Sequence, residues 1–119
     1  MIQLRYTFFV LILVAISCEE IIMEQDISNE KVLLLAPSNN AILTAGTGSF
    51  NWDAVKGADK YRLQIAIPNF TAANQMVLDT LISNTNFSKN LTVNTYQWRV
   101  KAINSAYETA YSVHDFTVK

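Results

Sequence analysis

Two stretches of the sequence decide the fold, FNWDAVKGADKYRLQI at residues 50–65 and NLTVNTYQWRVKAIN at residues 90–104. In the first, Tyr61, Leu63 and Ile65 alternate with polar side chains. In the second, apolar side chains likewise fall at every second position from Tyr96 to Ala102. A period of two is typical of a β-strand that buries one face. Each stretch therefore predicts a strand, and residues 55–59 between Trp52 and Tyr61 predict a turn.

Shorter patterns extend this reading to the rest of residues 31–119. The apolar run at residues 32–35 (VLLL) is the first expected strand, and residues 37–40 (PSNN) after it have turn chemistry. Further strands are expected near residues 47–52, 87–91 and 116–118. Residues 71–82 fit either a short helix or a strand, and the strand is favoured. The sum is about seven short strands with turns between them, which predicts an all-β, antiparallel two-sheet sandwich. Its predicted core comprises Trp52, Tyr61, Tyr96, Trp98 and Val100; exposed stacking platforms are the alternative for the aromatic members.

Composition narrows the class of protein further. The chain has 119 residues, of which 50% are hydrophobic and 16% charged, so a disordered polyelectrolyte is excluded. One Cys and one His exclude a disulfide framework and a multi-histidine metal centre. The net charge of −1 gives no electrostatic argument for nucleic-acid binding.

The first eighteen residues have the layout of an export signal. Arg5 is followed by eleven uncharged residues, 6–16, and then by Ser17 and Cys18. This apolar run is too short to span a bilayer, which needs about 20 residues, and it predicts a cleaved signal peptide at residues 1–17. Residues 14–18 (VAISC) resemble a bacterial lipobox, with Ala15 where Leu is usual. The resemblance implies that Cys18 is lipidated; the alternative is an ordinary secreted protein with a Cys at the cleavage point.

Residues 18–30 predict an acidic tether. Residues 19–30 carry five acids and no base, whereas residues 31–119 carry eight bases and five acids. A solvated spacer between membrane and domain is the simplest interpretation. Acids directly after a lipidated Cys also resemble the surface-export signal of Bacteroidota lipoproteins, and the periplasmic face of the outer membrane is the alternative location.

The two quoted stretches resemble a fibronectin type III-like module. The matching features are Trp52, Tyr61, Leu91, the "tyrosine corner" at Tyr96 and the run from Tyr96 to Asn104. The resemblance implies that Leu91 joins the core and that the Tyr96 hydroxyl bonds back to the preceding turn. The Trp-Arg-Val-x-Ala run is similar to modules of Bacteroidota surface lipoproteins. Residues 37–55 faintly resemble the N-terminal immunoglobulin-like domain of SusE-type starch-binding lipoproteins.

Two groups of side chains are candidates for ligand binding. The polar side chains of two expected strands, Lys60, Arg62 and Gln64 on one and Gln97, Arg99 and Lys101 on the other, share one outward face. Arg62, Gln64, Arg99 and Lys101 are the binding candidates among them, and the face predicts a cationic stripe that contacts an acidic polysaccharide or the tether. A solvated sheet face is the alternative. Aromatic side chains at Phe70, Tyr107 and Tyr111 fall in loops or at strand ends, where they stack on sugar rings or cover one end of the sandwich.

No pattern for catalysis is present in the sequence. The single His114 is not accompanied by a nucleophile motif, and neither a calcium loop nor a phosphate-binding glycine loop occurs. No enzyme activity, metal or cofactor is therefore expected. The sequence predicts a membrane-anchored interaction module that binds glycan or surface polymer, or alternatively a structural or accessory subunit of an outer-membrane protein complex.

Overall fold

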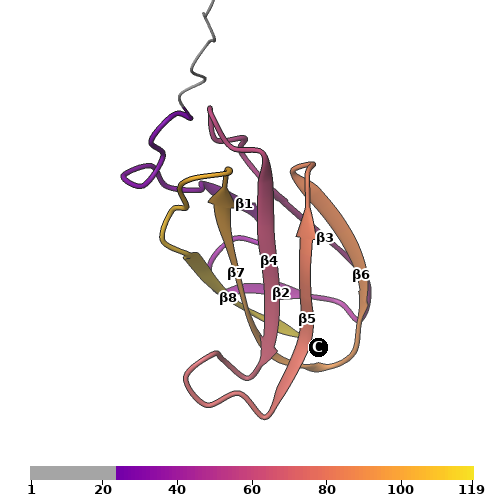
Figure 1. The fold of residues 1–119 in the computed structure, drawn as a ribbon. Coiled ribbons are helices and arrows are strands. Elements are labelled where there is room, and N and C mark those ends of the chain that lie inside the picture. Colours follow the sequence, from indigo (N-terminus) through magenta and orange to yellow (C-terminus); the bar gives the residue numbers. More distant parts are fainter. Residues whose placement is uncertain (1–23) are drawn as a thin grey trace, which may run out of the picture.

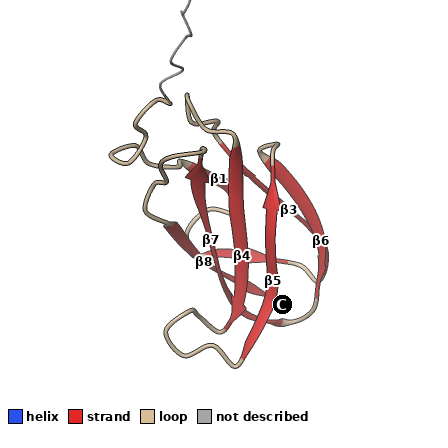
Figure 2. Cartoon of the chain, in the orientation of Figure 1, coloured by secondary structure: helices blue, strands red, loops and turns tan. Residues whose placement is uncertain are grey.

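The computed structural model describes residues 24–119, so the predicted signal peptide and Cys18 lie outside the described residues. All regular elements from residue 24 onward are strands joined by turns and loops (Figures 1 and 2). The eight strands are β1 (Leu34–Ala36), β2 (Ala41–Leu43), β3 (Gly46–Trp52), β4 (Lys60–Ile67), β5 (Gln75–Ile82), β6 (Asn86–Leu91), β7 (Asn94–Ile103) and β8 (Ser112–Val118). The all-β prediction is confirmed, and the ambiguous segment at residues 71–82 contains strand β5 rather than a helix.

The strands form two sheets packed face to face. One sheet has the order β1-β3-β6 and the other the order β2-β8-β7-β4-β5. Every pair is antiparallel except β2 with β8, which is parallel. About seven strands were expected, and the structure has eight because the chain crosses from one sheet to the other at residues 37–40. Asn40 adopts a φ of 66° in this turn, and its N–H donates to the Asp115 carbonyl oxygen at 2.7 Å.

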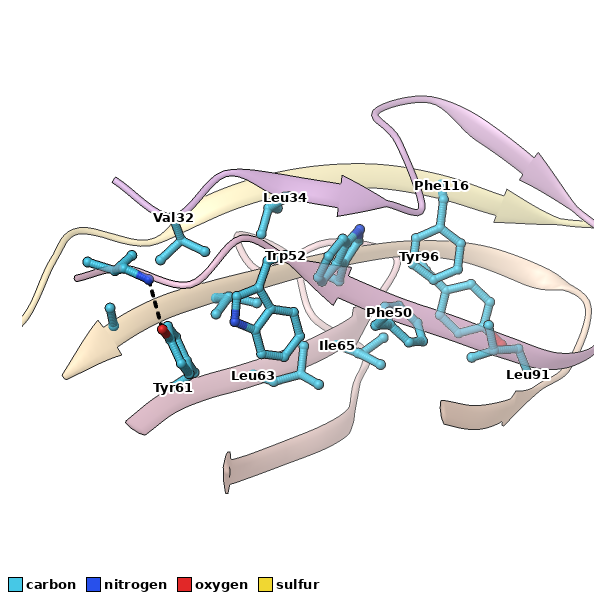
Figure 3. Packing of buried hydrophobic residues seen from close by; sticks show 14 of the residues in the cluster. Val32, Leu34, Phe50, Trp52, Tyr61, Leu63, Ile65, Leu91, Tyr96 and Phe116 are labelled. Carbon is cyan, nitrogen blue, oxygen red and sulfur yellow. Dashed lines mark hydrogen bonds between the residues drawn. The ribbon is translucent and has the colours of Figure 1, made fainter. Parts of the chain in front are cut away.

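Aromatic rings from both sheets fill the space between them (Figure 3). Trp98 of β7 has no exposed surface, and its ring contacts Phe50 and Trp52 of the opposite sheet at centroid distances of 5.1 and 6.3 Å. Tyr96 stacks on Phe116 at 5.0 Å. Edge-to-face and offset rings contribute energy beyond their buried area. All six residues predicted for the core, Trp52, Tyr61, Leu91, Tyr96, Trp98 and Val100, are buried.

Polar atoms of these aromatic residues are mostly paired with backbone groups. The Tyr96 hydroxyl donates to the Thr92 carbonyl oxygen at 2.7 Å, as the tyrosine-corner resemblance implies. The Tyr61 hydroxyl accepts a hydrogen bond from the Val55 N–H at 2.9 Å (Figure 3). The exception among buried side chains of the described region is Trp52, whose indole N–H has no hydrogen-bond partner. An unpaired buried donor lowers stability, so Trp52 stabilises the fold through its ring contacts alone.

The structured domain begins before residue 31, earlier than the sequence predicted. Ile27 is completely buried within the hydrophobic core. The Gln25 carbonyl oxygen accepts a hydrogen bond from the side-chain amide of Asn104, and the Gln25 side chain lies against Gly57, which has a φ of +93°. A Cβ atom on Gly57 would lie 2.9 Å from the Gln25 carboxamide carbon. Residues 24–30 are therefore packed against one end of the sandwich rather than acting as a free spacer.

Asn104 connects this N-terminal segment to two loops. Its amide nitrogen donates to the carbonyl oxygens of Gln25 and Gly57, at 2.8 and 3.1 Å. Its amide oxygen accepts from the N–H groups of Ala106 and Tyr107, at 3.0 and 2.8 Å. One buried side chain thus satisfies four backbone groups that would each be costly to bury unpaired.

Replacement of Ile27 tests whether this segment is part of the folded domain. Ile27→Ala should lower the free energy of unfolding by about 2 kcal/mol or more, because it opens a cavity in the core. Glu30→Ala, at an exposed side chain of the same segment, is the matched control and should change stability by less than about 0.5 kcal/mol. Urea unfolding measures both; equal, negligible effects would mean that the segment is not packed.

Candidate functional site

The four binding candidates of the predicted stripe lie on the outer face of the five-stranded sheet. Arg62 and Gln64 belong to β4, and Arg99 and Lys101 belong to β7. In the register of these strands Arg62 is opposite Lys101, and Gln64 is opposite Arg99. The predicted grouping on one face is therefore present. The stripe differs from the prediction because each of its cations already contacts another group of the same domain.

Two ion pairs neutralise part of this face. The Arg62 guanidinium makes two hydrogen bonds to the Asp79 carboxylate of β5, at 2.9 and 2.8 Å. These hydrogen bonds hold the pKa of Asp79 below its ordinary value, and they raise the pKa of Arg62. The Lys101 ammonium contacts the Glu108 carboxylate at 2.9 Å. Neither partner acid was identified by the sequence reasoning, because the contacts depend on strand register and on the path of the β7–β8 loop.

Arg99 is held by a third set of contacts. Its Nε–H donates to the Gln64 side-chain oxygen at 2.7 Å, and Gln64 is only 7% exposed. The guanidinium carbon lies 3.9 Å from the Phe70 ring centroid and 4.1 Å from the Tyr111 ring centroid. Cation–π contacts of this kind are favourable and also cover the charge. Phe70 and Tyr111 therefore pack onto the sheet face instead of projecting freely from their loops.

Tyr107, the third candidate aromatic, lies apart from this cluster. It belongs to the loop between β7 and β8, its N–H donates to Asn104, and it is 38% exposed. The His114 ring packs against Trp98 in a T-shaped arrangement, and its Nδ1 lies 3.2 Å from the Pro37 carbonyl oxygen. Within residues 24–119, no group of three or more metal-ligating side chains is assembled. No helix of that region is long and apolar enough to cross a membrane.

A groove of about 590 Å³ lies beside this cluster, on the same outer face. Its floor includes two cross-strand pairs, Thr95 with Thr117 and Gln97 with Asp115. Ile42 of β2 lines one part of the groove, and Asn69 and Thr71 of the β4–β5 loop line another. Sequence reasoning placed Gln97 on this face but missed the groove, because Thr and Asn at the other lining positions look ordinary one by one. The available signal was the alternation in β7 and β8, which places all four floor side chains outward.

The groove is held in shape by hydrogen bonds beneath and beside it. The Gln97 side-chain oxygen accepts from the Phe70 N–H at 2.9 Å, which fastens the β4–β5 loop over the sheet. The Gln97 side-chain nitrogen donates to an oxygen of the Asp115 carboxylate at 2.7 Å. On the β2 side, the Asp115 N–H donates to the Asn39 side-chain oxygen at 2.9 Å. The two sides of the groove are thus fixed by Gln97 and by the residue 37–40 turn.

Replacement of Asp79 tests the ion pair on the neighbouring part of the face. A carboxylate whose pKa is lowered by folding stabilises the fold above its ordinary pKa near 3.8, and this contribution is lost as the pH falls through the lowered value. The stability difference between wild type and Asp79→Asn should therefore be small but measurable at pH 7. It should shrink as the pH falls below 3.8 and vanish once the pH is below the lowered pKa of Asp79. Asp53→Asn removes a loop carboxylate that forms no ion pair with any of residues 24–119, and it is the control. A difference that persists unchanged in acid would contradict the pairing.

Comparison with known proteins identifies the fold. No family model and no curated protein sequence matches the chain. Among solved structures, the fibronectin(III)-like modules of Clostridium thermocellum CbhA superpose with a TM-score of 0.55 at 11% identity, covering 74% of this chain and 95% of that one. The fibronectin type III domain of human KIAA0970 gives 0.55 at 15% identity, covering 74% and 72%. The fn3 domain of the human collagen alpha-1(XX) chain gives 0.55 at 12% identity, covering 76% and 88%. The chain thus has a fibronectin type III-like fold.

Proposed function

We propose that this chain is a non-catalytic interaction module of the bacterial cell envelope that binds a glycan or surface polymer. Fibronectin type III-like domains are generally non-catalytic modules, which supports the proposal of a non-catalytic interaction module. The observation that supports glycan or polymer binding is the groove on the outer face of the five-stranded sheet. Its volume is within the range of about 300–1,000 Å³ that is common for ligand sites, and its floor presents hydroxyl, carboxamide and carboxylate groups.

The groove, rather than the arginine stripe, is the proposed contact surface. Arg62 and Arg99 were the sequence candidates, but their guanidinium groups are committed to Asp79, Gln64, Phe70 and Tyr111. A ligand that bound the arginine stripe would have to displace these partners before it gained new contacts with the guanidinium groups. The groove side chains Thr95 and Asp115 are exposed, and one oxygen of the Asp115 carboxylate makes no side-chain hydrogen bond within the described chain.

The proposed role includes a lipid anchor at Cys18 on the outer membrane of a Bacteroidota-like cell. The sequence of residues 14–18 supports this anchor. The position of residues 24–27 at one end of the sandwich is compatible with it. Residues 24–27 pack at the Gly57 and Asn104 end of the sandwich, whereas the loop after β4 lies at the opposite end (Figure 1). The groove therefore lies at the end of the sandwich opposite to the end from which the chain leads back toward Cys18.

Mass spectrometry of the chain purified from its native membranes tests the anchor. We expect the mature protein to begin at Cys18 and to carry more than one acyl chain. A single acyl chain binds a membrane only marginally, so a stable anchor needs at least two. Cys18→Ala should release the protein from the membrane fraction, and Ser17→Ala, which keeps a small residue before the Cys, is the control. Protease treatment of intact cells distinguishes the cell surface from the periplasmic face. A native chain that starts at Met1 or lacks lipid would disprove the anchor.

A glycan panel tests the binding role. The full-length chain in detergent micelles is screened by thermal unfolding against neutral and acidic oligosaccharides and against the envelope polysaccharide of the host. A ligand that binds the folded state alone raises the melting temperature, so at least one glycan should do so in a concentration-dependent manner. The absence of a shift with every glycan would reject the proposal.

A protein partner is the second candidate, and the β5 edge favours it. β5 forms one border of the five-stranded sheet, and Met76 and Leu81 on this strand are 46% and 48% exposed. Free sheet edges with apolar side chains accept an additional strand from a partner. An accessory role in an outer-membrane complex would use this edge, and crosslinking in cells to a single dominant protein partner would support it over glycan binding.

A further inference from the structure

We infer that the groove between β2, β7, β8 and the β4–β5 loop takes an uncharged saccharide chain, and that Asp115 is its main hydrogen-bond acceptor. This inference rests on the proposed function and specifies the ligand class that it leaves open. It reverses the sequence expectation of an acidic polysaccharide held by arginines.

The charge of the groove carries the argument. The residues that line it contain one ionisable side chain near neutral pH, the Asp115 carboxylate, and neither Lys nor Arg. The nearest cation along β7, Arg99, is bound to Gln64 and covered by Phe70 and Tyr111. An anionic polymer in this groove would face an unneutralised carboxylate with no cation to receive its own charge, which is unfavourable. A neutral polyol meets no such cost.

The hydrogen-bonding groups fit a polyol. Thr95 and Thr117 are neighbours across the two strands, and each hydroxyl both donates and accepts. Beside them, one oxygen of the Asp115 carboxylate accepts from Gln97 and the other makes no side-chain hydrogen bond within the described chain. Sugar hydroxyls are donors that a carboxylate binds with stronger, charge-assisted hydrogen bonds. The floor thus offers acceptors and donors at the spacing of adjacent strands, about 4.8 Å.

An apolar surface continues this floor. Ile42 of β2 is directly opposite Thr117 in the parallel pair, and it is 66% exposed. Pro68 lines the groove from the β4–β5 loop. Aliphatic side chains of this kind pack against the C–H faces of pyranose rings, whose edges carry the hydroxyls. The exposed Ile42 would be buried by such a ligand, which gives its position at the groove a physical reason.

Gln97 is a positioning residue for this site. Its side chain holds the Asp115 carboxylate through one hydrogen bond and the Phe70 backbone through another. Replacement of Gln97 by Leu should therefore weaken ligand binding, because the Asp115 carboxylate and the β4–β5 loop both lose the side chain that holds them. The loss should appear as a slower association or a broader ligand range, because the β4–β5 loop is no longer fixed over the groove.

Isothermal titration with two matched oligosaccharide sets tests the inference. The full-length chain is titrated with neutral oligosaccharides and with uronic-acid oligosaccharides of equal length. We expect a neutral set to bind, Asp115→Ala to weaken that binding at least tenfold, and Asp115→Asn to admit the uronic-acid set. Asp79→Asn, which removes a carboxylate of the same sheet face outside the groove, is the matched control and should leave binding unchanged. The exposure of Asp115 favours correct folding of its variants, and unchanged melting temperatures verify it.

Other outcomes separate the inference from the proposed function. Glycan binding that survives Asp115→Ala and is lost in Arg62→Ala or Arg99→Ala would overturn the groove and keep the glycan-binding role. Preferential binding of uronic-acid oligosaccharides to wild type would overturn the ligand class. No binding to either set, together with a negative glycan panel, would overturn both.

Discussion

Packing of aromatic rings between the two sheets is the constraint on which the other features depend. The single Cys lies at position 18, so no disulfide joins the sheets in residues 31–119. Trp98 contacts Phe50 and Trp52 across the interface instead. Because side chains alternate along a strand, burying Tyr96, Trp98 and Val100 directs Thr95, Gln97 and Arg99 outward. A shift of β7 by one residue would bury these polar groups and destroy both core and groove.

The same alternation explains which parts of the fold the sequence predicted. In β4 and β7 the apolar side chains recur strictly, and both strands and their core residues were predicted from it. The Tyr96 hydroxyl bond followed from family resemblance. Ile27 was not predicted as a core residue, because a lone apolar residue in an acidic segment has no periodicity. The division of the first strand into β1 and β2 was also missed, since it depends on the long-range bond from Asn40 to Asp115.

For the candidate site, the sequence predicted which sheet face the side chains occupy but not which groups they contact. Alternation placed Arg62, Gln64, Arg99 and Lys101 on one side of the sheet, as the structure has them. It gave no register between strands, so the contacts of Arg62 with Asp79 and of Lys101 with Glu108 were not foreseen. The contacts of Arg99 with Phe70 and Tyr111 also require two loops to fold back onto the sheet. These partners change the chemistry of the face, from an open cationic stripe to a paired one.

The groove arises from two departures from a plain sandwich. The chain crosses between sheets at residues 37–40, which adds β2 beside β8 and places Ile42 at one side of the outer face. The β4–β5 loop folds over the other side and is fastened there by Gln97. Both departures lie away from the Asn104 end, where the N-terminal segment is attached. The groove and the Asn104 end therefore lie at opposite ends of β7, because Thr95 and Gln97 line the groove near its start and Asn104 directly follows its last residue.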